Sequence, residues 1–161
     1  MKCPNTFQKL MHRVAMFRPV TTFFAPRIHR VDKALLKLTK GKFSLAGIMG
    51  WPIVEITTVC AKTKQPHTMP LVGIVDDEKI AIIASSFGRV HNPAWYYNLK
   101  AHSECDVLLN GRSRKYIARE IDGDEYQRYW RLAVSYYAGY EKYKERAAPR
   151  HIPVMLLEPK N

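Results

Sequence analysis

Three segments, far apart in the sequence, carry residue types suited to holding a flat, anionic molecule. Residues 62–67 place two lysines, a threonine and a histidine in a polar stretch, where cations and exposed amides could bind phosphate oxygens. Residues 85–96 run through Asn92 and Pro93 into a predicted helix, whose first N–H groups and dipole favour an anion. Residues 136–143 repeat tyrosine at every third position, so that the rings can share one face and cover a planar group.

Other chemistries lack their residues. The chain has no GxSxG, HExxH, Walker or GxGxxG motif, and no paired carboxylates stand out for acid-base catalysis. The six histidines have no paired spacing, and the three cysteines form no CxxC, so neither a zinc site nor a disulfide framework is indicated. Free cysteines make the cytoplasm the expected compartment. We therefore expect no metal, and chemistry supplied by a bound cofactor.

The elements that must position these segments are mainly strands. Apolar, β-branched runs predict six of them, at residues 53–59, 70–75, 79–85, 104–109, 114–121 and 155–157. The acidic residues 76–78 and the Asn110-Gly111 pair predict tight hairpin turns, whereas residues 60–68 read as a loop. Pro153 predicts that the last strand starts at a sheet edge.

Helices are predicted between the strands. Asn92 is the expected N-cap of a helix that has Pro93 as its first residue and runs to about residue 101. Asp122 and Glu125 have the spacing of a capping box, and a third helix should follow Gly139. The fold class is mostly β with flanking helices: an antiparallel barrel of about six strands over residues 46–161, with the helices packed outside.

The charge of the chain is concentrated at its front. The 161 residues carry a formal charge of +12, and residues 1–50 hold ten basic residues against one acidic residue. Apolar residues at helical spacing predict two basic amphipathic helices within residues 1–45. These helices either adsorb to an anionic membrane surface through residues 1–42 or pack on the barrel. No nucleic-acid-binding motif is present, no apolar stretch is long enough to span a membrane, and the oligomeric state is not indicated.

The ordered set of motifs resembles the deazaflavin-dependent nitroreductase family, which includes actinobacterial quinone reductases. Three stretches carry the resemblance, Thr57 to Leu71, Ala84 to Leu99 and Tyr137 to Pro159, and the match extends from about Arg27 to Pro159. The resemblance implies a split β-barrel that binds coenzyme F420, an 8-hydroxy-5-deazaflavin, and passes a hydride from the reduced ring to quinones, nitroaromatics or enones. It also implies a basic N-terminus at the inner face of the plasma membrane.

Residue roles follow from the same resemblance. The implied cofactor-binding residues are Lys62, Thr63, Lys64, Pro66, His67, Met69, Ala84, Ser85, Ser86, Arg89, Asn92, Pro93, Ala94 and Trp95, and the implied catalytic residues are Tyr137, Tyr140 and Tyr143. A tyrosine hydroxyl, of Tyr137 or Tyr140, would donate a hydrogen bond to the acceptor carbonyl as negative charge develops there.

The chain departs from the family where a phosphate is expected. The pattern Gly-Arg-Lys-Ser-Gly reads Cys60-Ala61-Lys62-Thr63-Lys64, and a lysine expected after Ser85 is a serine. Lys64 and Arg89 are the candidates to compensate for the lost cations. These departures leave two alternatives: the same barrel with FMN or haem as its ligand, or a non-catalytic peripheral membrane or cofactor-sequestering protein.

Overall fold

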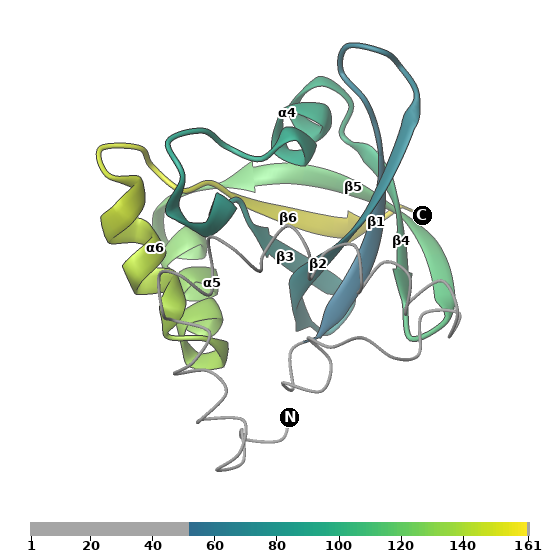
Figure 1. Cartoon of the computed structure of the whole chain (residues 1–161). Helices are drawn as coiled ribbons and strands as arrows, with labels where there is room; N and C mark the ends of the chain where they lie inside the picture. Colours follow the sequence, from purple (N-terminus) through teal and green to yellow (C-terminus); the bar gives the residue numbers. More distant parts are fainter. Residues whose placement is uncertain (1–51, 161) are drawn as a thin grey trace.

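The computed structural model describes residues 52–160, so both predicted N-terminal helices lie outside the described residues. The described chain forms a closed antiparallel barrel with the strand order β1-β2-β3-β6-β5-β4 (Figure 1). The strands are β1 (Ile53–Val59), β2 (Pro66–Asp76), β3 (Lys79–Ile83), β4 (Glu104–Leu109), β5 (Arg112–Ile121) and β6 (Val154–Pro159). The predicted fold class is confirmed.

The ends of the strands show which boundaries could be predicted from the local sequence. Asn110 and Gly111 have φ values of 52° and 78°, the left-handed pair that a two-residue hairpin turn requires. β2 begins earlier than predicted, because Thr68 pairs with Thr57 of β1 and their hydroxyls lie 2.8 Å apart. The predicted loop 60–68 therefore shrinks to residues 60–65.

The edge position predicted from Pro153 is wrong. β6 lies between β3 and β5 in a closed barrel, so its start is not at an edge. Pro153 instead contributes its carbonyl, which accepts the Ala84 N–H at 2.9 Å. A proline without an N–H fits here because it needs only to accept.

The strands β3 and β6 are buried on both faces. Ile80 and Ile82 point into the barrel, whereas Ala81 and Ile83 point outward under the helices. Residues 52–160 therefore form two apolar cores, one inside the barrel and one between the barrel and the helices, and both draw side chains from β3 and β6. This explains why the two strands read as continuous apolar runs and not as an alternation.

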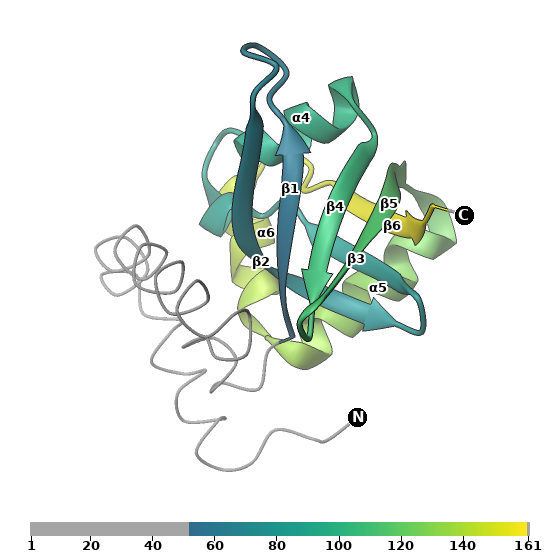
Figure 2. The same cartoon turned by 90° about the vertical axis from the view of Figure 1, so that its right-hand side faces the viewer.

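A short 3-10 turn, η1 (Ser86–Gly88), and three helices complete the described residues: α4 (Ala94–Ala101), α5 (Gly123–Tyr136) and α6 (Gly139–Ala147). Figures 1 and 2 show α4 at the end of the barrel beside the tip of the β1–β2 hairpin, with α5 and α6 together on another side. None of the helices in residues 52–160 is long and apolar enough to cross a membrane.

Two predicted helix caps are wrong in detail. The N-cap of α4 is Pro93, one residue later than predicted, because the side chain of Asn92 accepts a hydrogen bond from Arg150. α5 starts after Asp122 as predicted, but Asp122 makes no side-chain cap bond. Glu125 turns away from the helix start and accepts two hydrogen bonds from Arg119 at 2.7 and 2.8 Å.

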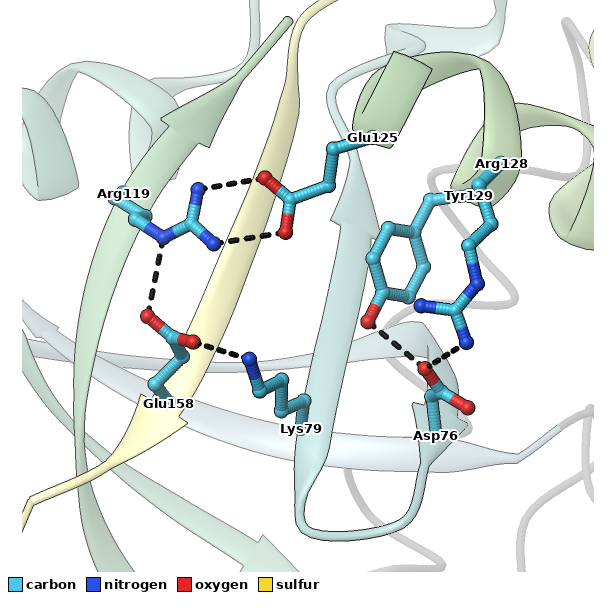
Figure 3. A network of polar contacts seen from close by, with 7 residues as sticks. All are labelled: Asp76, Lys79, Arg119, Glu125, Arg128, Tyr129 and Glu158. Carbon is cyan, nitrogen blue, oxygen red and sulfur yellow. Dashed lines mark hydrogen bonds and ion pairs between the residues drawn. The ribbon is translucent and has the colours of Figure 1, made fainter.

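A polar network fixes α5 on the barrel (Figure 3). Arg119 of β5 joins Glu125 of α5 to Glu158 of β6, and Glu158 also pairs with Lys79 at 2.6 Å. In a second group of contacts beside it, Asp76 of β2 accepts from Tyr129 at 2.9 Å and from Arg128 at 2.8 Å. Since α5 leads directly into residues 136–143, this network also sets where the tyrosine segment begins.

Candidate functional site

The first predicted segment is a closed loop at the tip of the β1–β2 hairpin, named here the cation loop (residues 60–65). The Cys60 N–H donates to the Gln65 carbonyl at 2.9 Å, and the Lys64 N–H donates to the Cys60 carbonyl at 2.9 Å. Lys64 has φ 61°, a conformation that glycine adopts without the Cβ penalty, at a position where the family pattern has glycine. The side chains of Lys62, Thr63 and Lys64 are exposed.

Asn98 of α4 anchors the cation loop. Its side chain is 6% exposed; Oδ1 accepts the Ala61 N–H at 3.0 Å, and Nδ2 donates to the Thr58 hydroxyl at 3.1 Å. Lys64 Nζ lies 3.0 Å from His102 Nε2, at the C-cap of the same helix. The sequence analysis did not single out Asn98; its signal was an amide on the face of the helix that also carries Trp95 and Leu99.

Hydrogen-bond donors of the cation loop stabilise negative charge at Cys60. The Thr63 hydroxyl, then the amides of Thr63 and Lys62, donate hydrogen bonds toward the Cys60 thiol and lower its pKa from 9.0 to about 7. Cys105 shows the opposite behaviour, because burial inside the barrel raises its pKa to about 12. Donors that favour a thiolate are the donors a phosphate requires, so the loop fits an anionic group.

The second segment leaves β3 and crosses to α4. Ala84 is buried, Ser85 and Ser86 are half-buried, and Arg89 and Ala94 are exposed. Trp95 points into the barrel core and is 4% exposed. Positive φ values at Ser86, Phe87 and Gly88, of 49°, 58° and 78°, make η1 a tight and strained turn.

Arg150, which the sequence analysis missed, holds this segment from the other side. Its guanidinium donates to the carbonyls of Ser85 at 2.9 Å, Arg89 at 3.0 Å and Ala84 at 3.2 Å, and to the side chain of Asn92. Nothing local in Pro149-Arg150-His151 indicates this role, since the contacts span about 60 residues of sequence.

The third segment gathers the three tyrosines. Ring centroids of Tyr137, Tyr140 and Tyr143 lie 5.8 to 6.1 Å apart, and each residue is 6% exposed. Gly139 allows this approach, because a Cβ there would lie 2.1 Å from the Tyr137 ring. Burial raises the pKa of all three hydroxyls, so they stay protonated at neutral pH.

The structure joins the segments in a row. The cation loop contacts α4, residues 84–93 lead into α4, and η1 meets α6 through an edge contact between Phe87 and Tyr143, with centroids 5.9 Å apart. Trp95 and the tyrosines, however, belong to different cores, one inside the barrel and one outside it.

Comparison with known proteins identifies the family. A family model described as F420H(2)-dependent quinone reductase matches residues 28–159. The chain belongs to this family. It is accordingly an oxidoreductase that uses coenzyme F420, and the matched range agrees with that expected from the resemblance.

Individual relatives support the family. An F420H(2)-dependent quinone reductase of Mycobacterium tuberculosis is 29% identical over 131 residues, covering 80% of this chain and 87% of the relative. A solved F420-H2 dependent reductase is 35% identical, with a TM-score of 0.62, over 66% of this chain and 94% of its own. The haem storage protein HutZ of Vibrio cholerae, 10% identical with a TM-score of 0.52 over 68% of this chain and 82% of its own, shares the fold alone.

Proposed function

We propose that the protein reduces quinones by hydride transfer and accepts nitroaromatics and enones as further substrates. The observation that supports it most is the cation loop: two exposed lysines with no acidic partner among residues 52–160, in a loop whose Thr63 hydroxyl and backbone amides favour a thiolate at Cys60. Bound reduced deazaflavin supplies the hydride, and the chain's own residues bind it and orient the acceptor.

The proposed binding roles follow exposure and charge. Lys62, Lys64, His67 and Arg89 are exposed and hold the phosphate-bearing tail. Ser85 and the neighbouring half-buried positions Ser86, Asn92 and Pro93 orient the ring, while Met69, Ala84 and Trp95 back them from the barrel side.

The proposed catalytic role belongs to the tyrosine hydroxyls. The Tyr137 and Tyr143 hydroxyl oxygens lie 3.4 Å apart and are protonated at neutral pH. A positioned O–H donor stabilises the negative charge that develops on the acceptor oxygen, which is worth more in a site that excludes water.

Binding and turnover test the proposal separately. Fluorescence titration should show saturable binding of reduced deazaflavin, and stopped-flow mixing with a quinone, a nitroaromatic and an enone should show its oxidation. We expect Tyr137→Phe to lower kcat about tenfold for every acceptor at unchanged cofactor affinity, since one donor to a developing charge contributes about 1–3 kcal/mol. Tyr97→Phe, at a residue 49% exposed on α4, is the control. Full activity in the Tyr137 variant would remove the catalytic assignment.

The basic residues 1–42 form the second part of the proposal. We infer that they bind anionic lipid at the inner face of the plasma membrane, where a lipid-soluble quinone resides, and that residues 1–45 form a unit separate from the barrel of residues 46–161. The full chain should sediment with vesicles containing phosphatidylserine and not with neutral vesicles. Replacing Lys9, Arg13 and Arg18 by glutamine should reduce sedimentation, and equal sedimentation of the variant and the unsubstituted chain would contradict a role of these three cations in membrane binding.

A further inference from the structure

We propose that Arg150 is a positioning residue of the cofactor site: it holds residues 84–92 in their binding conformation and adds a positive charge that no carboxylate of residues 52–160 neutralises. The proposal rests on the proposed function, because the charge has a purpose only if an anionic cofactor binds beside this segment.

The geometry is that of a clamp around a strained turn. Arg150 Nη1 donates to the Ala84 carbonyl and Nη2 to the Ser85 carbonyl, both just before η1. Arg150 Nε donates to the Arg89 carbonyl just after η1. One guanidinium therefore fixes both ends of the turn.

The hydrogen bonds from Arg150 offset the unfavourable backbone conformation of η1. Ser86 and Phe87 are non-glycine residues with positive φ, a conformation that is unfavourable for residues with a Cβ. Such backbone persists only where surrounding contacts hold it. The planar fork of arginine suits several fixed carbonyls at once, whereas an ammonium group offers no such geometry.

The charge of Arg150 stays uncompensated within the described residues. Its acceptors are four backbone carbonyls, the fourth being that of His151, and the amide oxygen of Asn92, all of them neutral. Of the ion pairs between residues 52 and 160, none involves Arg150. Nη2 has two N–H groups, and residues 52–160 provide an acceptor for one of them, Ser85.

Three full-length variants separate position from charge. Arg150→Met removes the fork and the charge, Arg150→Lys keeps the charge and loses the fork, and Arg131→Met removes one charge from the exposed side of α5. The readouts are hydrogen exchange of amides 86–92 in the cofactor-free protein, the Kd for reduced deazaflavin at two salt concentrations, and the split between KM and kcat.

For the methionine variant we expect faster exchange confined to residues 86–92, a Kd raised tenfold or more, and a weaker salt dependence. The lysine variant should show the same exchange with a smaller rise in Kd. KM for the cofactor should rise while KM for the quinone stays constant. Arg131→Met should leave all readouts within twofold of the unchanged protein.

Specific results would overturn the proposal. Unchanged exchange in Arg150→Met removes the positioning role, and an unchanged Kd in a protein that otherwise binds deazaflavin removes the charge role while the proposed function stands. Failure of the unsubstituted protein to bind deazaflavin overturns the proposed function and the charge role together, and the exchange experiment still decides whether Arg150 holds the turn. Exchange that rises throughout the barrel would mean a general folding defect and would also contradict the positioning role.

Discussion

Two regions of this molecule treat positive charge in opposite ways. In the network around α5, Lys79, Arg119 and Arg128 each face a carboxylate at 2.6 to 2.8 Å (Figure 3). At the end of the barrel near α4, the cations Lys62, Lys64, Arg89 and Arg150 form no ion pair with residues 52–160. The first arrangement fastens a helix, and the second leaves charge for a ligand.

Two arginines show the contrast most clearly. Hydrogen bonds to Glu125 and Glu158 raise the pKa of Arg119 above its usual range. Partial burial lowers the pKa of Arg150 instead, because its acceptors are neutral. A cation whose charge is left unbalanced in the free protein gains most when an anion arrives.

Charge reversal at the cation loop should have the largest effect. We expect Lys62→Glu to raise the Kd for reduced deazaflavin between about tenfold and a hundredfold at low salt, since a hydrogen bond to a charged group contributes about 1.5–3 kcal/mol. Titration by cofactor fluorescence measures it. Lys115→Glu, the same charge change on an exposed residue of β5, is the control. Equal losses in both variants would mean that only overall charge matters and would break the comparison.

Removal of Asn98, the uncharged residue that anchors the cation loop, should have the second largest effect. Asn98→Ala leaves the Ala61 N–H and the Thr58 hydroxyl without their shared partner, which should lower the free energy of unfolding by about 2 kcal/mol. Urea unfolding should give the same loss in low and high salt, since no ion pair is broken. Tyr96→Phe on the same helix loses one exposed hydrogen bond to Glu120 and should cost much less. A salt-dependent loss would contradict the neutral character of the Asn98 contacts.

The ion-pair network should matter for stability and not for binding. Arg119→Met should lower the free energy of unfolding by about 1 kcal/mol at pH 7 and low salt, because exposed pairs are worth about 0.2–1 kcal/mol each. Arg119 lowers the pKa of Glu125 below 4.5 in the folded state, and Lys79, followed by Arg119, does the same for Glu158. Their contribution is therefore present above pH 4.5 and is lost as the pH falls through the lowered values.

Urea unfolding at pH 7 and pH 3 tests whether the contribution of the ion pairs to the free energy of unfolding decreases as the pH falls. The Arg119 variant and the unsubstituted protein should differ at pH 7 and converge toward pH 3, with equal Kd values for deazaflavin. A difference that grows on acidification, or a changed Kd, would show that the network is coupled to the site.

The sequence was informative where structure depends on near neighbours. The hairpin at Asn110-Gly111 and the strands β3 and β6 could be predicted because backbone preference and apolar, β-branched runs are local properties. The start of β2 and the N-cap of α4 could not, since they depend on Thr57 and Arg150, which lie 11 and 58 residues away in the chain.

The same limit applies to the candidate site. For lysines in a polar loop and for regularly spaced tyrosines, the residue type alone indicates what chemistry they could support. Asn98 and Arg150 act by holding backbone that carries the chemistry, and their role exists only after β1, α4 and η1 have been brought together. Residues that position a site are therefore missed more readily than residues that contact a ligand.

Cysteine labelling gives the smallest effect and the most direct view of the cation loop. In a Cys3→Ser background, iodoacetamide should alkylate Cys60 with a midpoint near pH 7, whereas Cys105, with a pKa of about 12, should stay unlabelled in the folded protein. Thr63→Ala should move the Cys60 midpoint toward 9.0 and slow labelling at pH 7 severalfold, because the hydroxyl is the largest contributor to the lowered pKa.

An anion bound to the same amides would withdraw their hydrogen bonds from the thiolate and add negative charge nearby, so saturating deazaflavin should also slow the labelling of Cys60. Labelling that deazaflavin leaves unchanged, in a protein shown to bind it, would place the phosphate away from the Cys60 loop while leaving Arg150 and the tyrosines to be judged by their own experiments.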